Sequence, residues 1–200
     1  MRGASTIASV IPLLAVVAAY LLGSVNFGII VAAGAGVDIR SVGSGNPGTS
    51  NVLRTLGKKL AAVVLLGDGL KGAAAAAIGA LAVDPEFGYV TLLAAVVGHS
   101  FPIWHQFKGG KSVATAIGGF IYLAPAVGLV VGVVWLIVVL VWKTASIASI
   151  AAMLLVVPGL ALAGRTTTEL VWASVIVIFV IARHAGNVRR IASGSEREIQ

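Results

Sequence analysis

The sequence predicts an all-α, polytopic membrane protein in which residues 1–200 form one domain. Hydrophobic residues make up 58% of the chain and charged residues only 10%, whereas a soluble domain carries roughly 25% charged residues. A chain of this composition cannot cover its own surface with polar side chains. Its apolar residues also gather in long stretches, and about 20 of them suffice for a helix to cross a bilayer. We therefore expect several membrane-spanning helices.

Five apolar stretches are expected to be spans, and polar turns separate them. They are residues 7–35, 60–83, 87–102, 146–163 and 170–181. The first stretch is too long for the apolar core of a signal peptide, and further spans follow it, so we expect it to be the first transmembrane helix. The second stretch ends at a turn that contains Asp84 and Pro85.

Residues 112–142 are intermediate in length between one span and two. Charge favours two, because cytoplasmic loops of membrane proteins carry an excess of Lys and Arg. If this stretch is a hairpin that turns near Ala124 and Pro125, nearly all basic residues lie on the cytoplasmic side. They are Arg40, Arg54, Lys58, Lys59, Lys108, Lys111, Lys143, Arg183, Arg189, Arg190 and Arg197. We predict seven transmembrane helices, two of them short, with the N-terminus outside and the C-terminus cytoplasmic. A re-entrant hairpin and a total of five spans are the alternatives.

The remaining composition excludes several classes of site. The net charge of +7, from 14 basic and 7 acidic residues, indicates orientation and anionic lipid in a membrane protein rather than nucleic acid. The chain has no cysteine, which excludes disulfides, thiolate metal sites and a cysteine nucleophile. It has three histidines, and its acidic residues are scattered, so neither a metal site nor a cofactor is expected.

The first polar segment, residues 41–54, has the composition of an anion-binding loop. Glycines permit positive φ, so that successive backbone N–H groups can point into one concavity. Ser and Asn add neutral donors, and an arginine adds a charged fork suited to phosphate. The alternative is an ordinary loop that joins two helices, but such a loop needs only one or two turn residues rather than this run of Gly, Ser and Asn. The predicted substrate-binding residues here are Gly43, Ser44, Gly45, Asn46, Gly48, Asn51 and Arg54.

The second polar segment, residues 107–112, contains a Gly-Lys-Ser sequence similar to the end of a nucleotide-binding P-loop. The first glycine of that motif would fall at His105, and an apolar helix takes the place of the strand, so nucleotide binding is excluded. A helix expected to begin near Ser112 still presents its N-terminus to an anion. The alternative is a pair of cytoplasmic lysines beside a turn. The predicted residues are Lys108, Gly109, Gly110 and Lys111.

The third polar segment, residues 183–190, has helical spacing. Arg183, Asn187 and Arg190 are predicted to share one face, with His184 next to it. Histidine titrates near neutrality, which makes His184 the leading candidate for a base or an orienting group. A basic helix that merely touches anionic lipid is the alternative. It explains the arginines but not His184 or Asn187.

A few polar residues inside the apolar stretches are weaker candidates. Asp68 and Lys71 can pair at i and i+3. Ionisable groups at this depth are costly and usually functional, although a neutral pair that fixes helix packing explains them equally well. Ser146 and Ser149 are weaker candidates for substrate binding. For His99, a place at the membrane interface is the expected explanation.

Together, the three segments resemble the motifs of the PlsY family of bacterial glycerol-3-phosphate acyltransferases. The matching patterns are S-x-G-S-G-N-x-G-x-[ST]-N-x-x-R at residues 41–54, G-H-x-[FY]-P with F-K-G-G-K-x-V-A-T at residues 98–115, and R-H-x-x-N-[IV]-x-R-[IL]-x-x-G-x-E at residues 183–196. The resemblance runs essentially from end to end. It implies a multi-pass protein of the bacterial plasma (inner) membrane with its active site on the cytoplasmic side.

The resemblance implies acyl transfer from a long-chain acyl-phosphate to the 1-hydroxyl of glycerol 3-phosphate, giving lysophosphatidic acid and inorganic phosphate. We expect direct displacement without an acyl-enzyme, in which His184, Lys108 and Asn187 are catalytic. Lys108 and Lys111 would hold the acyl-phosphate, whereas Ser44, Arg54, His184 and Asn187 would hold glycerol 3-phosphate. Arg190, Ser146 and Ser149 complete the expected binding set. Either His184 or the substrate phosphate takes the proton. Membrane lipid is an expected partner, and docking of the soluble enzyme that makes acyl-phosphate stays open.

Two other classes of protein compete with the enzyme. An anion transporter or channel explains the basic clusters, but it predicts charged residues throughout the spans and helices broken at mid-membrane. A structural membrane subunit leaves the three polar segments unexplained. Serine hydrolase chemistry is not expected either, because the chain contains no G-x-S-x-G sequence.

Overall fold

The computed structural model describes residues 2–199, with side chains from residue 9 onward. Helices, turns and irregular loops make up this range, which contains no strand. The α-helices are α1 (Arg2–Ser24), α2 (Phe27–Gly34), α3 (Thr49–Leu56), α4 (Lys58–Ala82), α5 (Phe87–Ser100), α6 (Val113–Leu123), α7 (Pro125–Trp142), α8 (Ala145–Leu162), α9 (Thr167–Ala182) and α10 (Ala185–Ala192), and a short 3-10 helix covers Ile103–His105. The all-α prediction is confirmed.

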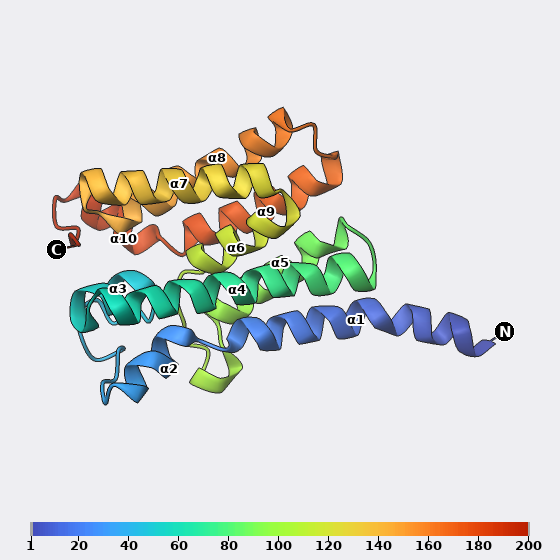
Figure 1. Ribbon diagram of the computed structural model, residues 1–200, viewed down its shortest axis with the longest axis horizontal. Helices are drawn as coiled ribbons and strands as arrows, with labels where there is room; N and C mark the ends of the chain where they lie inside the picture. Colours follow the sequence, from blue (N-terminus) through green and yellow to red (C-terminus); the bar gives the residue numbers. More distant parts are fainter. Residues whose placement is uncertain (1, 200) are drawn as a thin grey trace.

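The long helices form an elongated bundle with chemically different ends. Figure 1 shows α1, α4 and α5 along one side and α7, α8 and α9 along the other, with α6 between them. The short helices α3 and α10 and the C-terminus lie together at one end, and the N-terminus lies at the opposite end. The first and third polar segments, which are far apart in sequence, are therefore neighbours in space.

Small residues allow the central helices to pack closely. A Cβ atom on Gly72 of α4 would collide with the carbonyl oxygen of Thr115 in α6. A Cβ atom on Gly118 of α6 would collide with the carbonyl oxygen of Gly69 in α4. Backbones that approach this closely are typical of helices packed in lipid. There the hydrophobic effect does not drive helices together, and small residues permit the close van der Waals packing that does.

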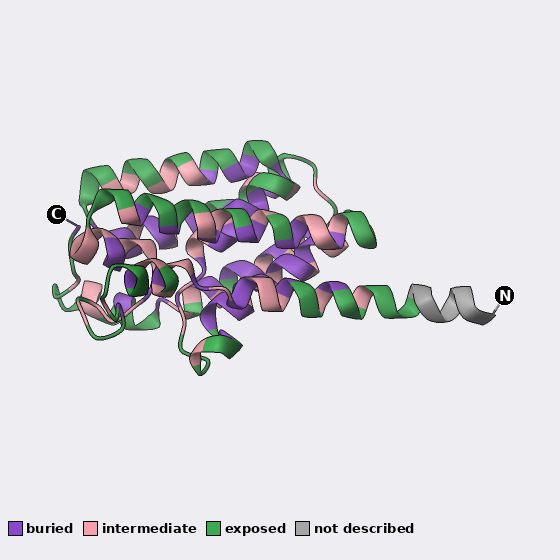
Figure 2. Cartoon of the chain, turned by 60° about the horizontal axis from the view of Figure 1, so that its bottom comes forward, coloured by how far each residue is buried: buried purple, intermediate pink, exposed green. Residues whose placement is uncertain are grey.

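The core lies between α5, α6, α7, α8 and α9, and apolar side chains also cover the outside. Tyr89 and Phe120 are fully buried, with ring centroids 6.4 Å apart. By contrast, Leu129, Val133 and Leu140 of α7 are more than half exposed. Figure 2 shows exposed residues along the outer faces of the helices. Such an apolar exterior suits a lipid environment and would aggregate in water.

Within the described residues, five helical segments are long and apolar enough to cross a membrane, or six if the bent pair α9 and α10 is counted as one span. The predicted turn in residues 112–142 is confirmed, since α6 ends at Leu123 and α7 begins at Pro125. Helix α6 has only 11 residues, or about 16 Å at 1.5 Å per residue, which is short for an apolar layer of about 30 Å. The total of seven spans stays a prediction.

The first predicted helix, residues 7–35, is interrupted in the structure. Helix α1 ends at Ser24, and Asn26 caps α2 by accepting a hydrogen bond from the backbone N–H of Ile29 at 3.1 Å. The break leaves the backbone carbonyl of Val25 without a helical partner, and Lys71 Nζ donates to it at 2.6 Å. An Asn within an apolar run was the local signal for this break.

Candidate active site

The first polar segment folds into a loop that Asn51 closes from inside. Asn51 Oδ1 accepts from the backbone N–H of Ser44 at 2.8 Å, and its Nδ2 donates to the carbonyls of Ile39 and Val42 at 3.2 and 3.0 Å. Gly43 has a φ of +60°, and a Cβ atom there would collide with the Asn51 side chain. The side-chain amide of Asn51 is therefore hydrogen-bonded within the loop, although Asn51 had been predicted to bind substrate.

Part of this loop faces a cavity of about 670 Å³. Of the residues predicted in the first segment, Ser44, Asn46, Gly48, Asn51 and Arg54 line it, whereas Gly43 and Gly45 do not. Both of these glycines adopt positive φ, so they shape the loop. Arg54 Nε donates to the carbonyl of Glu198 at 2.8 Å, and Nη2 donates to that of Arg197 at 3.4 Å. The C-terminal segment thus lies against the cavity.

The second polar segment contributes Lys111 to the cavity but not Lys108. The backbone N–H groups of Gly109 and Gly110 donate to the carbonyls of Ser100 and His99 at 3.2 and 3.0 Å. These N–H groups are consequently not free to bind an anion, although Gly109 and Gly110 had been predicted to bind substrate. Neither glycine lines the cavity, and Lys108 is exposed outside it. Ser112 precedes α6, as predicted, and lines the cavity with Lys111.

The third polar segment bends instead of continuing as one helix. The axes of α9 and α10 differ by 54°, and the break falls at Arg183 and His184. Arg183 therefore does not share a helix face with Asn187 and Arg190, as the spacing had predicted. Its Nη2 donates to the carbonyl of Gly110 at 3.3 Å, and its guanidinium lies 4.9 Å from the Phe101 ring centroid. The bend nevertheless brings Arg183, His184, Asn187 and Arg190 to the wall of the same cavity.

A chain of polar side chains joins the second segment to the C-terminus. Lys111 Nζ donates to Asn187 Oδ1, and Asn187 Nδ2 donates to Glu196 Oε1 at 2.6 Å. Glu196 also accepts from Ser146 Oγ at 3.0 Å and from Arg190 Nε at 2.9 Å. The carboxylate of Glu196 therefore organises three residues that had been predicted from sequence. Glu196 itself was absent from the predicted site, although it ends the third motif.

Burial changes the protonation of two groups in the site. It lowers the pKa of Lys111 to about 8, and nearby Arg190 and Arg183 act in the same direction while Glu196 opposes them. Burial also lowers the pKa of His184, which lies in the turn after α9, to about 4. His184 is therefore neutral at pH 7. Because a carbonyl can only accept, His184 Nδ1 donates to the carbonyl of Val180 at 2.8 Å. Nε2 then carries a lone pair.

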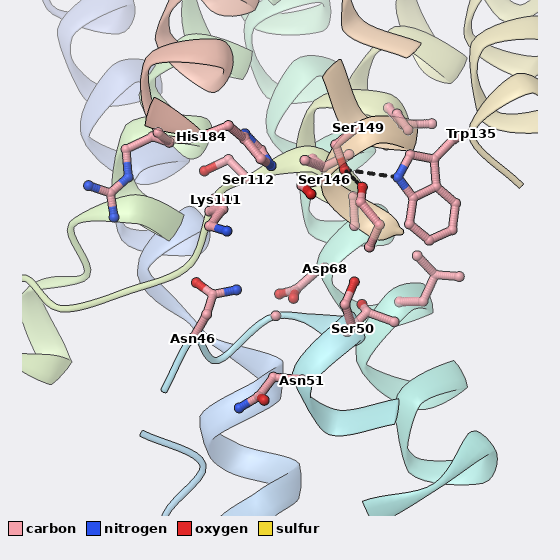
Figure 3. Close-up of a pocket in the computed structure, with 18 of the residues that line it drawn as sticks. Asn46, Ser50, Asn51, Asp68, Lys111, Ser112, Trp135, Ser146, Ser149 and His184 are labelled. Carbon is pink, nitrogen blue, oxygen red and sulfur yellow. Dashed lines mark hydrogen bonds between the residues drawn. The ribbon is translucent and has the colours of Figure 1, made fainter. Parts of the chain in front are cut away.

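The opposite part of the cavity is apolar and lies between helices α4, α6 and α7. Its walls include Leu66, Leu70, Ile117, Ile121 and Leu136, with Gly132 among them. Trp135 also lines the cavity, and its Nε1 donates to Ser149 Oγ at 3.0 Å. Figure 3 shows Asn46, Lys111 and His184 on one side of the cavity and Ser149 and Trp135 on the other. Ser146 and Ser149 thus line the cavity as expected.

His99 was not predicted as a site residue from the sequence, and Asp68 was only a weaker candidate. Both are buried and line the cavity, and they are linked through Lys71. The predicted pair of Asp68 and Lys71 is confirmed, with 2.7 Å between Oδ1 and Nζ. His99 had been placed at the membrane interface because its neighbours in sequence are apolar and aromatic.

Comparison with known proteins agrees with this geometry. The model of the family described as glycerol-3-phosphate acyltransferase matches residues 13–194. The chain belongs to this family. Its relatives include the glycerol-3-phosphate acyltransferases of Sinorhizobium medicae, 44% identical over 181 residues that cover 90% of this chain and 88% of the relative, and of Neisseria meningitidis serogroup C, 39% identical over 192 residues that cover 92% and 96%.

Two solved structures of PlsY, an integral membrane glycerol 3-phosphate acyltransferase, share the fold. The glycerol 3-phosphate form has a TM-score of 0.89, with 41% identity over 94% of this chain and 96% of PlsY. The lysophosphatidic acid form has a TM-score of 0.87, with 41% identity over 94% of each chain. The resemblance inferred from the three motifs is confirmed, and this member of the PlsY glycerol-3-phosphate acyltransferase family is an integral, multi-pass membrane protein.

Proposed function

We propose that this chain transfers an acyl group from acyl-phosphate to the 1-hydroxyl of glycerol 3-phosphate, giving 1-acylglycerol 3-phosphate and inorganic phosphate. One observation carries the proposal: a single cavity joins a cationic, hydroxyl-rich and amide-rich region to an apolar region between helices. The first region suits two phosphates, and the second suits a fatty chain. The PlsY structures with glycerol 3-phosphate and with lysophosphatidic acid support the acceptor and the product.

Side chains, rather than the glycine backbone, carry phosphate recognition in this proposal. Lys111, Arg183 and Arg190 supply positive charge from two different segments of the chain. Ser44 and Asn46 face the same space from the first polar segment. Since the amides of Gly109 and Gly110 are already bonded, Lys111 takes the place of that backbone. Charge-assisted hydrogen bonds to phosphate are roughly twice as strong as neutral ones.

We propose that the substrate phosphate, and not His184, is the final proton acceptor. With a pKa of about 4, His184 is a weaker base than a phosphate monoester, whose second pKa is about 6. His184 Nε2 accepts a hydrogen bond from the 1-hydroxyl and orients it. The hydroxyl oxygen bonds to the acyl carbon, the bond from that carbon to the phosphate oxygen breaks, and phosphate leaves with the electron pair. The hydroxyl proton passes to a phosphate oxygen.

The transfer is direct in this proposal, and three of the serines that line the cavity, Ser112, Ser146 and Ser149, support this because their hydroxyls donate to other groups of the protein. Ser112 Oγ bonds with Ser100 Oγ and donates to the carbonyl of Val96. Ser149 Oγ donates to the carbonyl of Ala145, and Ser146 Oγ donates to Glu196. Within residues 10–199, no serine hydroxyl is hydrogen-bonded to a histidine, which is the arrangement that activates a serine nucleophile.

The proposed location is the bacterial plasma membrane, with the cavity on the cytoplasmic side. The basic residues Arg54, Lys111 and Arg190 lie at the end of the bundle that carries α3 and α10. Loops rich in Lys and Arg remain cytoplasmic. Docking of the enzyme that makes acyl-phosphate at this end would be compatible with the topology.

Phosphate release by the purified protein in lipid tests the proposal. Glycerol 3-phosphate is supplied with either palmitoyl phosphate or palmitoyl-CoA, alongside the variant His184→Ala. We expect release from palmitoyl phosphate only, and a loss for His184→Ala of less than about 100-fold, since a residue that acts as the base contributes about 10²–10⁴. Turnover with palmitoyl-CoA would overturn the donor. An acylated serine, trapped and identified by mass spectrometry, would overturn direct transfer. Turnover with neither donor would favour an anion transporter, which a flux assay in vesicles would detect.

A further inference from the structure

Asp68, Lys71 and His99 form a buried polar cluster that the proposed chemistry does not yet use. Their exposed fractions are 1%, 3% and 3%. Asp68 and Lys71 belong to α4, and His99 belongs to α5. Asp68 and His99 both line the cavity, and Figure 3 shows Asp68 between Asn46 and Ser50. Packing two helices together would not require a histidine that reaches the cavity.

The hydrogen bonds of Lys71 determine the tautomer of His99. Lys71 Nζ contacts the carbonyl of Val25 at 2.6 Å, Asp68 Oδ1 at 2.7 Å and His99 Nδ1 at 2.8 Å. An ammonium group has three N–H donors and no lone pair. With Lys71 charged, each donor has one acceptor and Nδ1 accepts from Nζ, since the Asp68 carboxylate lies farther from Nδ1, at 3.5 Å. The imidazole of His99 is neutral, and its proton is on Nε2.

Nε2 of His99 is a hydrogen-bond donor without a partner in the part of the chain that the structure describes with side chains, residues 9–199. It lies against Gly110, where a Cβ atom would collide with it. Gly110 immediately precedes Lys111, which faces the cavity. Nε2 is not among the fully buried side-chain atoms that lack a partner, and His99 lines the cavity, so the cavity is where an acceptor is expected.

The two cavity histidines consequently have opposite polarity. His184 donates through Nδ1 to Val180 and offers a lone pair at Nε2. His99 accepts through Nδ1 from Lys71 and offers an N–H at Nε2. A lone pair suits a hydroxyl group, whereas an N–H suits an anionic oxygen. The charges of Asp68 and Lys71 compensate one another, so the Asp68 carboxylate does not repel that anion strongly.

We propose that His99 Nε2–H donates a hydrogen bond to a phosphate oxygen of one substrate, and that Lys71 and Asp68 are positioning residues that hold the ring in the required tautomer. The proposal rests on the proposed function. Both substrates carry a phosphate group, and kinetics can tell them apart. The substrate whose KM depends on His99 is the one that it holds.

The variants His99→Gln and His99→Asn form a matched pair for the test. The amide nitrogen of Gln can reach the place of Nε2, whereas that of Asn reaches only the place of Nδ1. His105→Gln serves as a control, because His105 lies outside the cavity. Initial rates of phosphate release are measured while glycerol 3-phosphate and palmitoyl phosphate are varied in turn. Gel filtration and thermal unfolding verify that each variant is folded.

We expect His99→Asn to raise the KM of one substrate about 10- to 100-fold, the range for losing a hydrogen bond to a charged group, and His99→Gln to raise it less than threefold. His105→Gln should leave both KM values unchanged. Equal KM values for the Gln and Asn variants, or a fall in kcat alone, would overturn the proposal. If either variant is unfolded, Lys71→Met and Lys71→Arg replace the pair: Arg keeps the donor to Nδ1 and should retain the KM that Met loses. Wild-type protein that fails to turn over contradicts the proposed function instead, because the variants are judged only against active protein.

Discussion

Lys111 and Asn187 are 76 positions apart in sequence, and Lys111 Nζ donates a hydrogen bond to Asn187 Oδ1 at the wall of the cavity. Asn187 Nδ2 in turn donates a hydrogen bond to Glu196 Oε1. The neutral amide thus lies between the ammonium group and the carboxylate, which do not pair directly. Lys111 keeps most of its charge available for a phosphate while remaining held in place.

Replacing Asn187 with Leu should leave Lys111 and Glu196 without their shared partner. Losing a hydrogen bond to a charged group costs about 1.5–3 kcal/mol, so kcat/KM should fall about 10- to 150-fold. Val188→Ala, on the exposed side of α10, is the control and should change kcat/KM less than twofold. Steady-state kinetics with both substrates provide the measurement. Equal losses in the two variants would show that α10 is merely fragile.

The two lysines of the second polar segment should differ in importance. Lys111 is in the cavity, whereas Lys108 is exposed outside it. We expect Lys111→Met to reduce kcat/KM by at least about 100-fold, as for loss of a preorganised charge at a reacting group. Lys108→Met should reduce it much less, through long-range attraction that salt screens. Assays at low and high ionic strength compare the variants. A larger loss for Lys108 would restore the catalytic role predicted for it from sequence.

Activity should fall as the pH rises through the pKa of Lys111. Burial lowers this pKa to about 8, compared with about 10.4 for an ordinary lysine. The charge that binds phosphate is therefore present below pH 8 and is lost above it. Between these two pKa values the folded state binds fewer protons than the unfolded state, so the free energy of unfolding increases with pH. Phosphate binding weakens over the same range, because Lys111 loses its charge.

A pH profile of kcat/KM from pH 6.5 to 9.5 measures this effect. The Lys111→Arg variant keeps its charge throughout the range, so its profile should lack the fall above pH 8. An identical fall in the variant would assign the titration to another group, such as the substrate or a different residue.

Gly132 should control how long an acyl chain fits the apolar part of the cavity. It lines that part on α7, and a Cβ atom there would meet Ile117 at an ordinary distance of 3.5 Å. A larger side chain therefore has room to enter the cavity without breaking the fold. Since each buried CH₂ group contributes about 0.8 kcal/mol, Gly132→Leu should lower kcat/KM for palmitoyl phosphate relative to decanoyl phosphate at least about tenfold. Val133→Leu, on the lipid-exposed side of the same helix, should preserve the ratio, and a shift there as large as that of Gly132→Leu would contradict the assignment.

Local patterns were sufficient for some features of the site. Asp68 and Lys71 had to be close because an α-helix places i and i+3 on one face, and the structure has them 2.7 Å apart. The turn before Pro125 followed from the distribution of basic residues, which requires residues 112–142 to start and end on the same side of the membrane. The break at Asn26 and the bend at His184 were not predicted, because tertiary contacts with other helices compensate for the hydrogen bonds that such interruptions forfeit.

The sequence by itself determined that the protein lies in a membrane, that it is helical, and which three polar segments are candidates for its site, because composition, periodicity and motif are local properties. Tertiary structure decided which polar atoms remain free. The side-chain amide of Asn51 and the backbone amides of Gly109 and Gly110 are hydrogen-bonded within the protein, whereas Lys111 and His99 line the cavity with N–H groups that can reach a substrate. An N–H group can donate to a substrate only if it does not already donate to a group of the protein, and most of the partners that decide this lie on other helices.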